Sequence, residues 1–123
     1  MKRLQIPDEL RKLLPLTPAV FFVLFSLADG EKHGYAIMQD MAALSGGKFR
    51  MGPGTLYTTL QRLLDLGLIE EVRGSRSVVE RESRRRYYRV TGHGKTLLEE
   101  ELSRMDSVVR LARTKKLVPR TAE

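Results

Sequence analysis

GPGTLYTTLQRLLDLGLI, residues 52–69, is the stretch that decides the fold of this chain of 123 residues. Pro53 is favoured at the first position of a helix, and Gly67 is a typical residue just past the end of one. Between them, leucines recur at helical spacing and predict a helix over 53–66 with one buried face. These leucines are Leu56, Leu60, Leu63 and Leu64.

The opposite face of this helix has the composition of a nucleic-acid contact. Its residues, with those at its flanks, are Gly54, Thr55, Tyr57, Thr58, Gln61 and Arg62. Gln and Arg form bidentate hydrogen bonds with base edges in the major groove, and Thr can contact a thymine methyl group. An ordinary solvated helix face has a similar composition, so the helix alone leaves both interpretations open.

Two helices are expected upstream of this stretch. Thr17 followed by Pro18 predicts the start of the first, and Asp29-Gly30 predicts its end. Because the residues between them are apolar around nearly the whole circumference, we expect a second surface to cover the outer side of this helix. A shorter helix over 34–44 ends at a Ser-Gly-Gly turn.

Downstream of Gly67 the pattern changes from helix to strand. Residues 68–73 and 86–90 are rich in β-branched and aromatic residues and flank a polar tip, which predicts a two-stranded hairpin. After Thr91-Gly92, apolar residues alternate at spacings of four and three, as in a helix that pairs with a second copy. The members of this stripe are Leu98, Leu102, Met105, Val109 and Ala112.

These elements predict a mostly α fold with a small β-hairpin. Three helices followed by a hairpin is the order of a winged helix-turn-helix, in which the third helix enters the major groove and the hairpin touches the flanking backbone. We assign residues 17–91 to this domain and 92–116 to a C-terminal dimerisation helix. Residues 1–16 are then an N-terminal extension and 117–123 a flexible tail.

Positive charge is concentrated in the predicted hairpin. The chain has a net charge of +7 and a pI near 10.1, which favours a polyanionic partner. Seven arginines stand between residues 73 and 89 against two glutamates. Such a run repels itself unless it meets a polyanion, and Arg binds phosphate well. We therefore expect phosphate contacts from Arg81, Arg84, Arg85 and Arg86.

The motifs of the chain resemble a known family when taken together. They are His33-Gly34-Tyr35, Gly54-Thr55-Leu56-Tyr57, Gly67-Leu68-Ile69 and Arg86-Tyr87-Tyr88-Arg89-Val90-Thr91 with Gly94. The ordered set is similar to that of the PadR family of bacterial transcriptional regulators. The short C-terminal region resembles the subgroup that ends in a single dimerisation helix.

The resemblance implies a homodimeric regulator, usually a repressor, that binds double-stranded DNA at a pseudo-palindromic operator. It also implies that the helix over 53–66 reads DNA and that Tyr57 contacts the DNA backbone. Gly52 departs from the family pattern, because many members have a hydroxyl residue there.

Enzymatic, metal and membrane functions are not expected. The chain has no Cys, and His33 and His93 are its only histidines, without a compact set of carboxylates at ligand spacing. No set of nucleophile, base and orienting acid is evident, so we expect no enzyme and no cofactor. The most apolar run, residues 19–28, is too short to span a bilayer, which favours a cytoplasmic protein.

The first helix allows further interpretations. Phe21, Phe22 and Phe25 fit a dimerisation surface together with the C-terminal stripe, and they could line a pocket for a small aromatic effector at the dimer interface. Core packing is the competing role for these rings. The alternative function for the whole chain is a protein-interaction module without specific DNA binding, and a basic RNA binder comes third.

Overall fold

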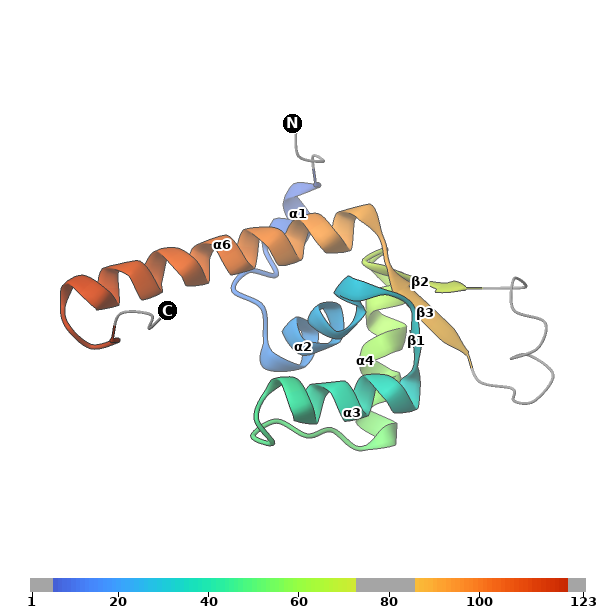
Figure 1. Ribbon diagram of the computed structural model, residues 1–123. Helices are drawn as coiled ribbons and strands as arrows, with labels where there is room; N and C mark the ends of the chain where they lie inside the picture. Colours follow the sequence, from blue (N-terminus) through green and yellow to red (C-terminus); the bar gives the residue numbers. More distant parts are fainter. Residues whose placement is uncertain (1–5, 73–85, 120–123) are drawn as a thin grey trace.

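The computed structural model describes residues 6–72 and 86–119, and in this part the chain is mostly helical with one small antiparallel sheet (Figure 1). The elements are α1 (Asp8–Arg11), α2 (Pro18–Ser26), the 3-10 helix η1 (Leu27–Asp29), β1 (Lys32–His33), α3 (Gly34–Leu44), α4 (Pro53–Asp65), β2 (Ile69–Val72), β3 (Tyr87–Val90) and α6 (Gly92–Thr114). The predicted order of three helices, a hairpin and a long final helix is confirmed.

The helix ends form where their capping residues predict them. The Thr17 hydroxyl accepts a hydrogen bond from the Val20 N–H, and Pro18 opens α2. The Thr91 hydroxyl caps α6 in the same way, by accepting from the Gly94 N–H. Gly67 follows α4 with a φ of +76°, a left-handed conformation that glycine adopts without strain.

The sheet has three strands rather than the two that the sequence predicted. Its order is β1-β3-β2, with Lys32 opposite Tyr88 and Ile69 opposite Val90. β1 is two residues long and shows no alternation of its own, so the local sequence does not reveal it. It forms because β3 offers a free edge to the segment that leads into α3.

The apolar circumference of α2 is covered mainly within the single chain. Val20, Phe21, Val23 and Leu24 are buried, because α3, α4 and α6 all pack around this helix. The expectation that a second surface must cover its outer side is therefore wrong for most of α2. Phe22 and Phe25 are its aromatic residues that stay partly exposed.

The N-terminal segment is attached to α6 by both apolar and charged contacts. Ile6, Leu10 and Leu16 are buried in the common core. The Leu16 N–H donates to the carboxylate of Glu101 at 2.9 Å, and Arg104 donates to the same carboxylate at 2.7 Å. The hydrogen bond from Arg104 lowers the pKa of Glu101, against the effect of its burial, so this buried side chain is held in its charged form.

Candidate nucleic-acid interface

The position of α4 in the core determines which of its residues face solvent. Leu56, Leu60 and Leu63 are buried between α2, α3 and β2. Residues on the other side of the helix therefore point away from the core. The exposed residues of α4 include Gly54, Thr55, Tyr57, Thr58, Gln61, Arg62 and Asp65.

Several polar side chains of α4 are bonded within the helix itself. The Thr58 hydroxyl donates to the Gly54 carbonyl at 3.0 Å, and the Gln61 amide donates to the Asp65 carboxylate at 3.0 Å. These exposed hydrogen bonds are weak in water, so a base edge can replace them at small cost. The N-cap residue of α4 is Gly52, which provides no side-chain oxygen to bond the first turn.

Tyr57 lies at the flank of this face and is partly exposed, with 45% of its surface accessible. Its phenol packs directly over Gly34, the first residue of α3. A Cβ atom at position 34 would lie 2.4 Å from the Tyr57 hydroxyl oxygen and 2.8 Å from its Cζ atom. The position of this ring therefore depends on the absence of a side chain at Gly34.

Arg86 directly precedes β3 and forms a bidentate ion pair with Glu71 of β2. Its Nε and Nη2 atoms donate to the two carboxylate oxygens at 3.1 and 3.0 Å. Glu71 is the cross-strand partner of Tyr88, whose ring is buried, so the pair lies on the sheet face that packs on the core. Glu71 raises the pKa of Arg86, with further contributions from Tyr88 and Tyr57, against the opposing effect of burial.

A second pair neutralises the other described arginine of the hairpin. Arg89 donates to Glu70 at 2.7 Å, and these residues are direct cross-strand partners on the opposite sheet face. The predicted phosphate contacts Arg81, Arg84 and Arg85 lie outside the described residues.

His33 has a structural role at the start of α3. Its Nδ1 atom accepts a hydrogen bond from the Ala36 N–H at 3.2 Å. Its ring stacks on Tyr35 and meets Tyr87 edge to face. Within residues 6–72 and 86–119, no group of three His, Cys, Asp or Glu side chains is arranged to hold a metal ion. Over the same residues, no helix has the length and apolar character to cross a bilayer.

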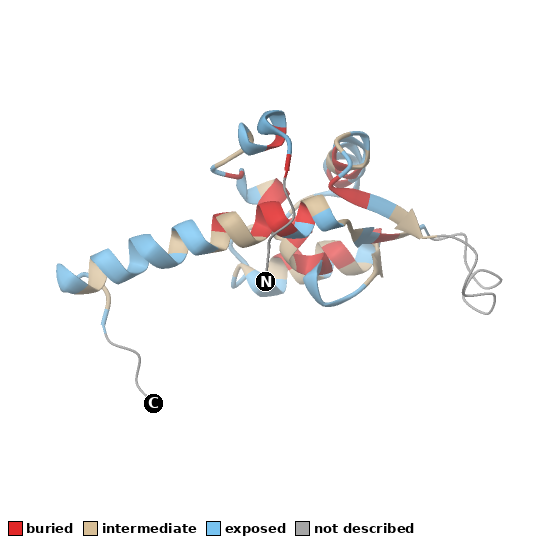
Figure 2. Ribbon diagram, turned by 90° about the horizontal axis from the view of Figure 1, so that it is seen from above, coloured by how far each residue is buried: buried red, intermediate tan, exposed pale blue. Residues whose placement is uncertain are grey.

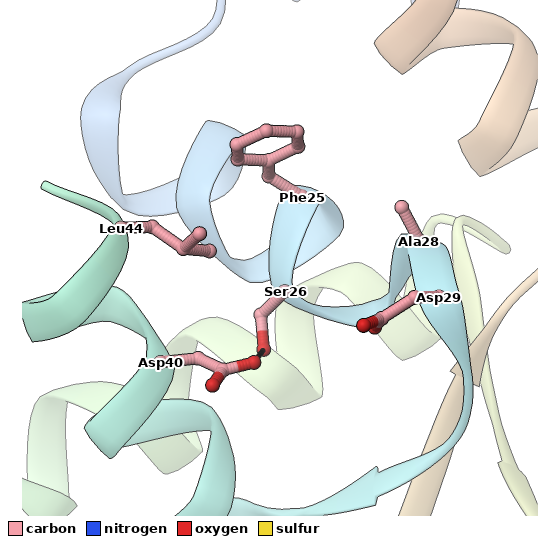
Figure 3. A pocket seen from close by; sticks show the side chains of 6 residues that line it. All are labelled: Phe25, Ser26, Ala28, Asp29, Asp40 and Leu44. Carbon is pink, nitrogen blue, oxygen red and sulfur yellow. Dashed lines mark hydrogen bonds between the residues drawn. The ribbon is translucent and has the colours of Figure 1, made fainter.

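The three phenylalanines of α2 differ in how far a ligand or partner can contact their rings. Phe21 is buried and stacks on Phe25 with 5.3 Å between ring centroids. Phe25 lines an open hollow of about 340 Å³ between α2 and α3, where Ser26 donates to Asp40 at 2.9 Å (Figure 3). Phe22 stacks on Phe49 instead.

The apolar stripe of α6 is divided between the core and solvent. Leu98 is buried, and Leu102 and Met105 are partly covered. Beyond them α6 projects past the rest of the described chain, and its surface there is largely exposed (Figure 2). The exposed apolar residues of this part are Val108 at 53%, Val109 at 36% and Leu111 at 62% of their surface.

Comparison with known protein families identifies the family to which the chain belongs. Residues 23–100 match the family described as "Transcriptional regulator PadR-like family". The chain belongs to this family. Its members are transcriptional regulators and not enzymes, and the fold and motif order described above agree with that assignment.

Two relatives show how far the similarity of this PadR-like chain extends. Transcriptional regulator Rv3488 of Mycobacterium tuberculosis is 36% identical over 88 residues, which cover 72% of this chain and 76% of the relative. An uncharacterized 37.1 kDa protein in transposon TN4556 of Streptomyces fradiae is 39% identical over 87 residues. That match covers 71% of this chain but 23% of the larger protein.

Solved structures show the same winged-helix fold at lower identity. A PadR family transcription regulator from Clostridium difficile superposes with a TM-score of 0.62 at 21% identity, over 80% of this chain and 97% of that chain. PadR from Bacillus subtilis, solved in complex with operator DNA, has a TM-score of 0.56 at 24% identity. It is matched over 72% of this chain and 47% of its own.

Two residues at this candidate interface were given no role from the sequence. Gly34 supports the Tyr57 ring, and Glu71 holds the Arg86 guanidinium. Gly34 belongs to a motif that was recognised, but its contact with Tyr57 spans two helices. The only sequence signal for the role of Glu71 is that it is an acidic residue in a strand whose predicted partner strand contains arginines.

Proposed function

We propose that this PadR-like regulator is a cytoplasmic, homodimeric repressor that binds a pseudo-palindromic operator. In this proposal α4 lies in the major groove and the arginine-rich hairpin lies on the DNA backbone. The observation that carries it is the polar face of α4, which Leu56, Leu60 and Leu63 turn away from the core. Bacillus subtilis PadR, whose fold is similar, binds operator DNA.

Direct readout is assigned to Thr58, Gln61 and Arg62, with Thr55 and Tyr57 on the backbone. Gln61 and Arg62 each have the hydrogen-bonding groups for a bidentate contact to a base. Thr58 is nearer the N-terminus of α4, the end that reaches deepest into the groove in this class of fold. Gly54 lets backbone N–H groups approach a phosphate at the positive end of the helix.

Substitutions on this face should change sequence preference rather than overall affinity. Gln61→Ala should cost about 1 to 3 kcal/mol on the preferred operator and little on unrelated DNA. The operator is first obtained by selection from random duplexes at physiological salt. Titrations of each variant with the operator and with a scrambled duplex then give the ratio of the two affinities.

Thr59→Ala is the matched control for Thr58→Ala. Both hydroxyls donate to the carbonyl four residues earlier, at 2.9 and 3.0 Å, but Thr59 is half-buried and Thr58 is exposed. If substitutions at Thr58, Gln61 and Arg62 all leave the affinity ratio unchanged, direct readout by α4 is wrong. Weak binding that is equal for all duplexes would instead indicate a protein-interaction module.

Glu71→Gln should strengthen binding to all DNA sequences alike. In the native protein Glu71 neutralises Arg86, and exposed ion pairs of this kind contribute at most about 1 kcal/mol. Without the carboxylate, Arg86 is available to phosphate, and one added contact should steepen the log-log salt dependence of affinity by about 0.9. The measurement is the affinity for one duplex across a series of salt concentrations.

Glu70→Gln controls for the change in net charge. It frees Arg89 on the opposite face of the sheet and should leave the salt slope nearly unchanged. An unchanged slope in Glu71→Gln would place Arg86 away from DNA. An equal change in both variants would show that only the overall charge matters.

A small aromatic effector belongs to the same proposal, at the interface between two copies. The hollow beside Phe25, lined by α2, η1 and α3, offers such a ligand an open site with an apolar wall. Phe21 contributes to it by supporting the Phe25 ring from the core side.

A further inference from the structure

Gly34 and Tyr57 make a contact that joins the two helices of the helix-turn-helix. Gly34 is buried at the start of α3, whereas Tyr57 is exposed on α4. The Tyr57 hydroxyl lies where a Cβ atom of residue 34 would be only 2.4 Å away. No side chain other than the hydrogen of glycine fits beneath the phenol in this position.

The same phenol is close to the hairpin. Gly34, which lies beneath the phenol, directly follows His33, and His33 pairs with Tyr87 at the start of β3. The Tyr57 side chain therefore lies where α3, α4 and β3 meet, with 45% of its surface open to solvent. At this junction the Tyr57 hydroxyl, which extends from the reading helix α4, is close to the start of β3.

We infer that Gly34 is a positioning residue for DNA binding. Because it has no side chain, the Tyr57 phenol can pack over it, and this packing places the Tyr57 hydroxyl where it can donate to a DNA phosphate. The inference rests on the proposed function, and it adds a residue that does not itself contact DNA. Gly34 acts only through the place that it leaves for the ring.

An alanine methyl group at this position would displace the phenol rather than the backbone. The atoms that it meets are the Tyr57 hydroxyl oxygen, Cζ and Cε1, the far end of an exposed side chain. Ordinary contact between heavy atoms is about 3.5 Å, so the hydroxyl must move by about 1 Å. A shift of that size breaks an O–H···O bond, whose distance is normally about 2.7 Å.

The test is a double-mutant cycle of Gly34→Ala and Tyr57→Phe, measured as affinity for the operator and for a scrambled duplex at one salt concentration. Tyr57→Phe should lower both affinities by about tenfold, the effect of one hydrogen bond to a charged group. Gly34→Ala should lower both by a similar factor. In the Tyr57→Phe background Gly34→Ala should cause no further loss, because the hydroxyl is already absent.

Ala43→Gly is the control for a general weakening of α3. Ala43 is exposed near the other end of that helix, and glycine there lowers helix propensity without approaching Tyr57. This variant should keep the native DNA affinity. A nuclear Overhauser effect between the Gly34 α-protons and the Tyr57 ring protons tests the packing in the free protein, independently of DNA.

The outcomes separate this inference from the proposed function. If the native protein binds DNA but Gly34→Ala binds equally well, or if the losses in the cycle multiply, the positioning role is overturned. Absence of the Overhauser effect in the native protein overturns it as well. If the native protein binds no duplex, the proposed function fails and the inference falls with it.

Discussion

Gly94→Ala is expected to lower the free energy of unfolding by about 3 kcal/mol, the upper part of the usual range for overpacking a core. Gly94 lies buried in the first turn of α6, against Leu68 in the turn between α4 and β2. A Cβ atom there would lie 2.1 Å from the Leu68 carbonyl oxygen and 2.8 Å from Cγ2 of Val90. This clash can be relieved only if the backbone at Leu68 or at residue 94 shifts.

The backbone at this point is held by several hydrogen bonds. The Leu68 carbonyl accepts from the Thr91 N–H at 3.0 Å, and the Thr91 hydroxyl donates to the Gly67 carbonyl at 2.6 Å. Moving Leu68 away from α6 would strain these bonds and the start of β2. This is the contrast with Gly34, where the obstructing group is the free end of a side chain.

Gly54→Ala provides the control for Gly94→Ala. A Cβ atom at position 54 meets nothing within 4 Å, and the residue is exposed in the first turn of α4. Alanine there should raise the free energy of unfolding by up to about 1 kcal/mol, because it has the higher helix propensity. Urea unfolding of both variants tests this. Equal and small effects would show that α6 does not pack on Leu68 as described.

The main helices could be predicted from the sequence because their ends carry local signals. Thr17 with Pro18, and Thr91 before α6, cap their helices as the sequence indicates. β1 could not be predicted, because two residues carry no period and their partner in β3 lies more than fifty positions away. Pairing over that distance is determined by the whole fold and not by the strand itself.

The candidate site was predictable to the extent that one helix determines it. The spacing of Leu56, Leu60 and Leu63 fixes the rotation of α4, and this decides that Gln61 and Arg62 face solvent. The partners of these side chains could not be predicted in the same way. The ion pair of Arg86 with Glu71 depends on the register of the hairpin, and the place of Tyr57 depends on the packing of α3.

The stripe on α6 shows a further limit of sequence patterns. Leu98 and Val109 belong to the same alternation of four and three, yet Leu98 is buried in its own chain and Val109 is exposed. An apolar period indicates that a face is covered but does not identify what covers it. The difference arises because the first part of α6 packs on the rest of the chain, whereas its last part extends past it (Figure 1).

Val109→Glu is expected to convert the proposed dimer into a monomer. Val109 continues the stripe of Leu102 and Met105 along α6 and is exposed in the single chain, and a second copy can cover it with the same apolar residues. Burying a large apolar side chain yields about 2 kcal/mol. Val109 is 36% exposed, so a partner buries about a third of its surface, which is about 0.7 kcal/mol per copy. Because twofold symmetry counts each residue twice, losing Val109 alone should weaken the dimer by about 1.5 kcal/mol, or about tenfold.

Ser107→Glu is the matched control, because it introduces the same charge on the exposed opposite face of α6. Light scattering at micromolar concentration should find a dimer for the native protein and for Ser107→Glu, and a monomer for Val109→Glu. A glutamate at the interface adds to the loss, since a buried charge without a partner is costly. A native monomer would refute the dimer, and dissociation of both variants would show that charge alone separates the copies. A native monomer would also remove the twofold axis that a pseudo-palindromic operator requires, because two copies of α4 must then find their half-sites independently.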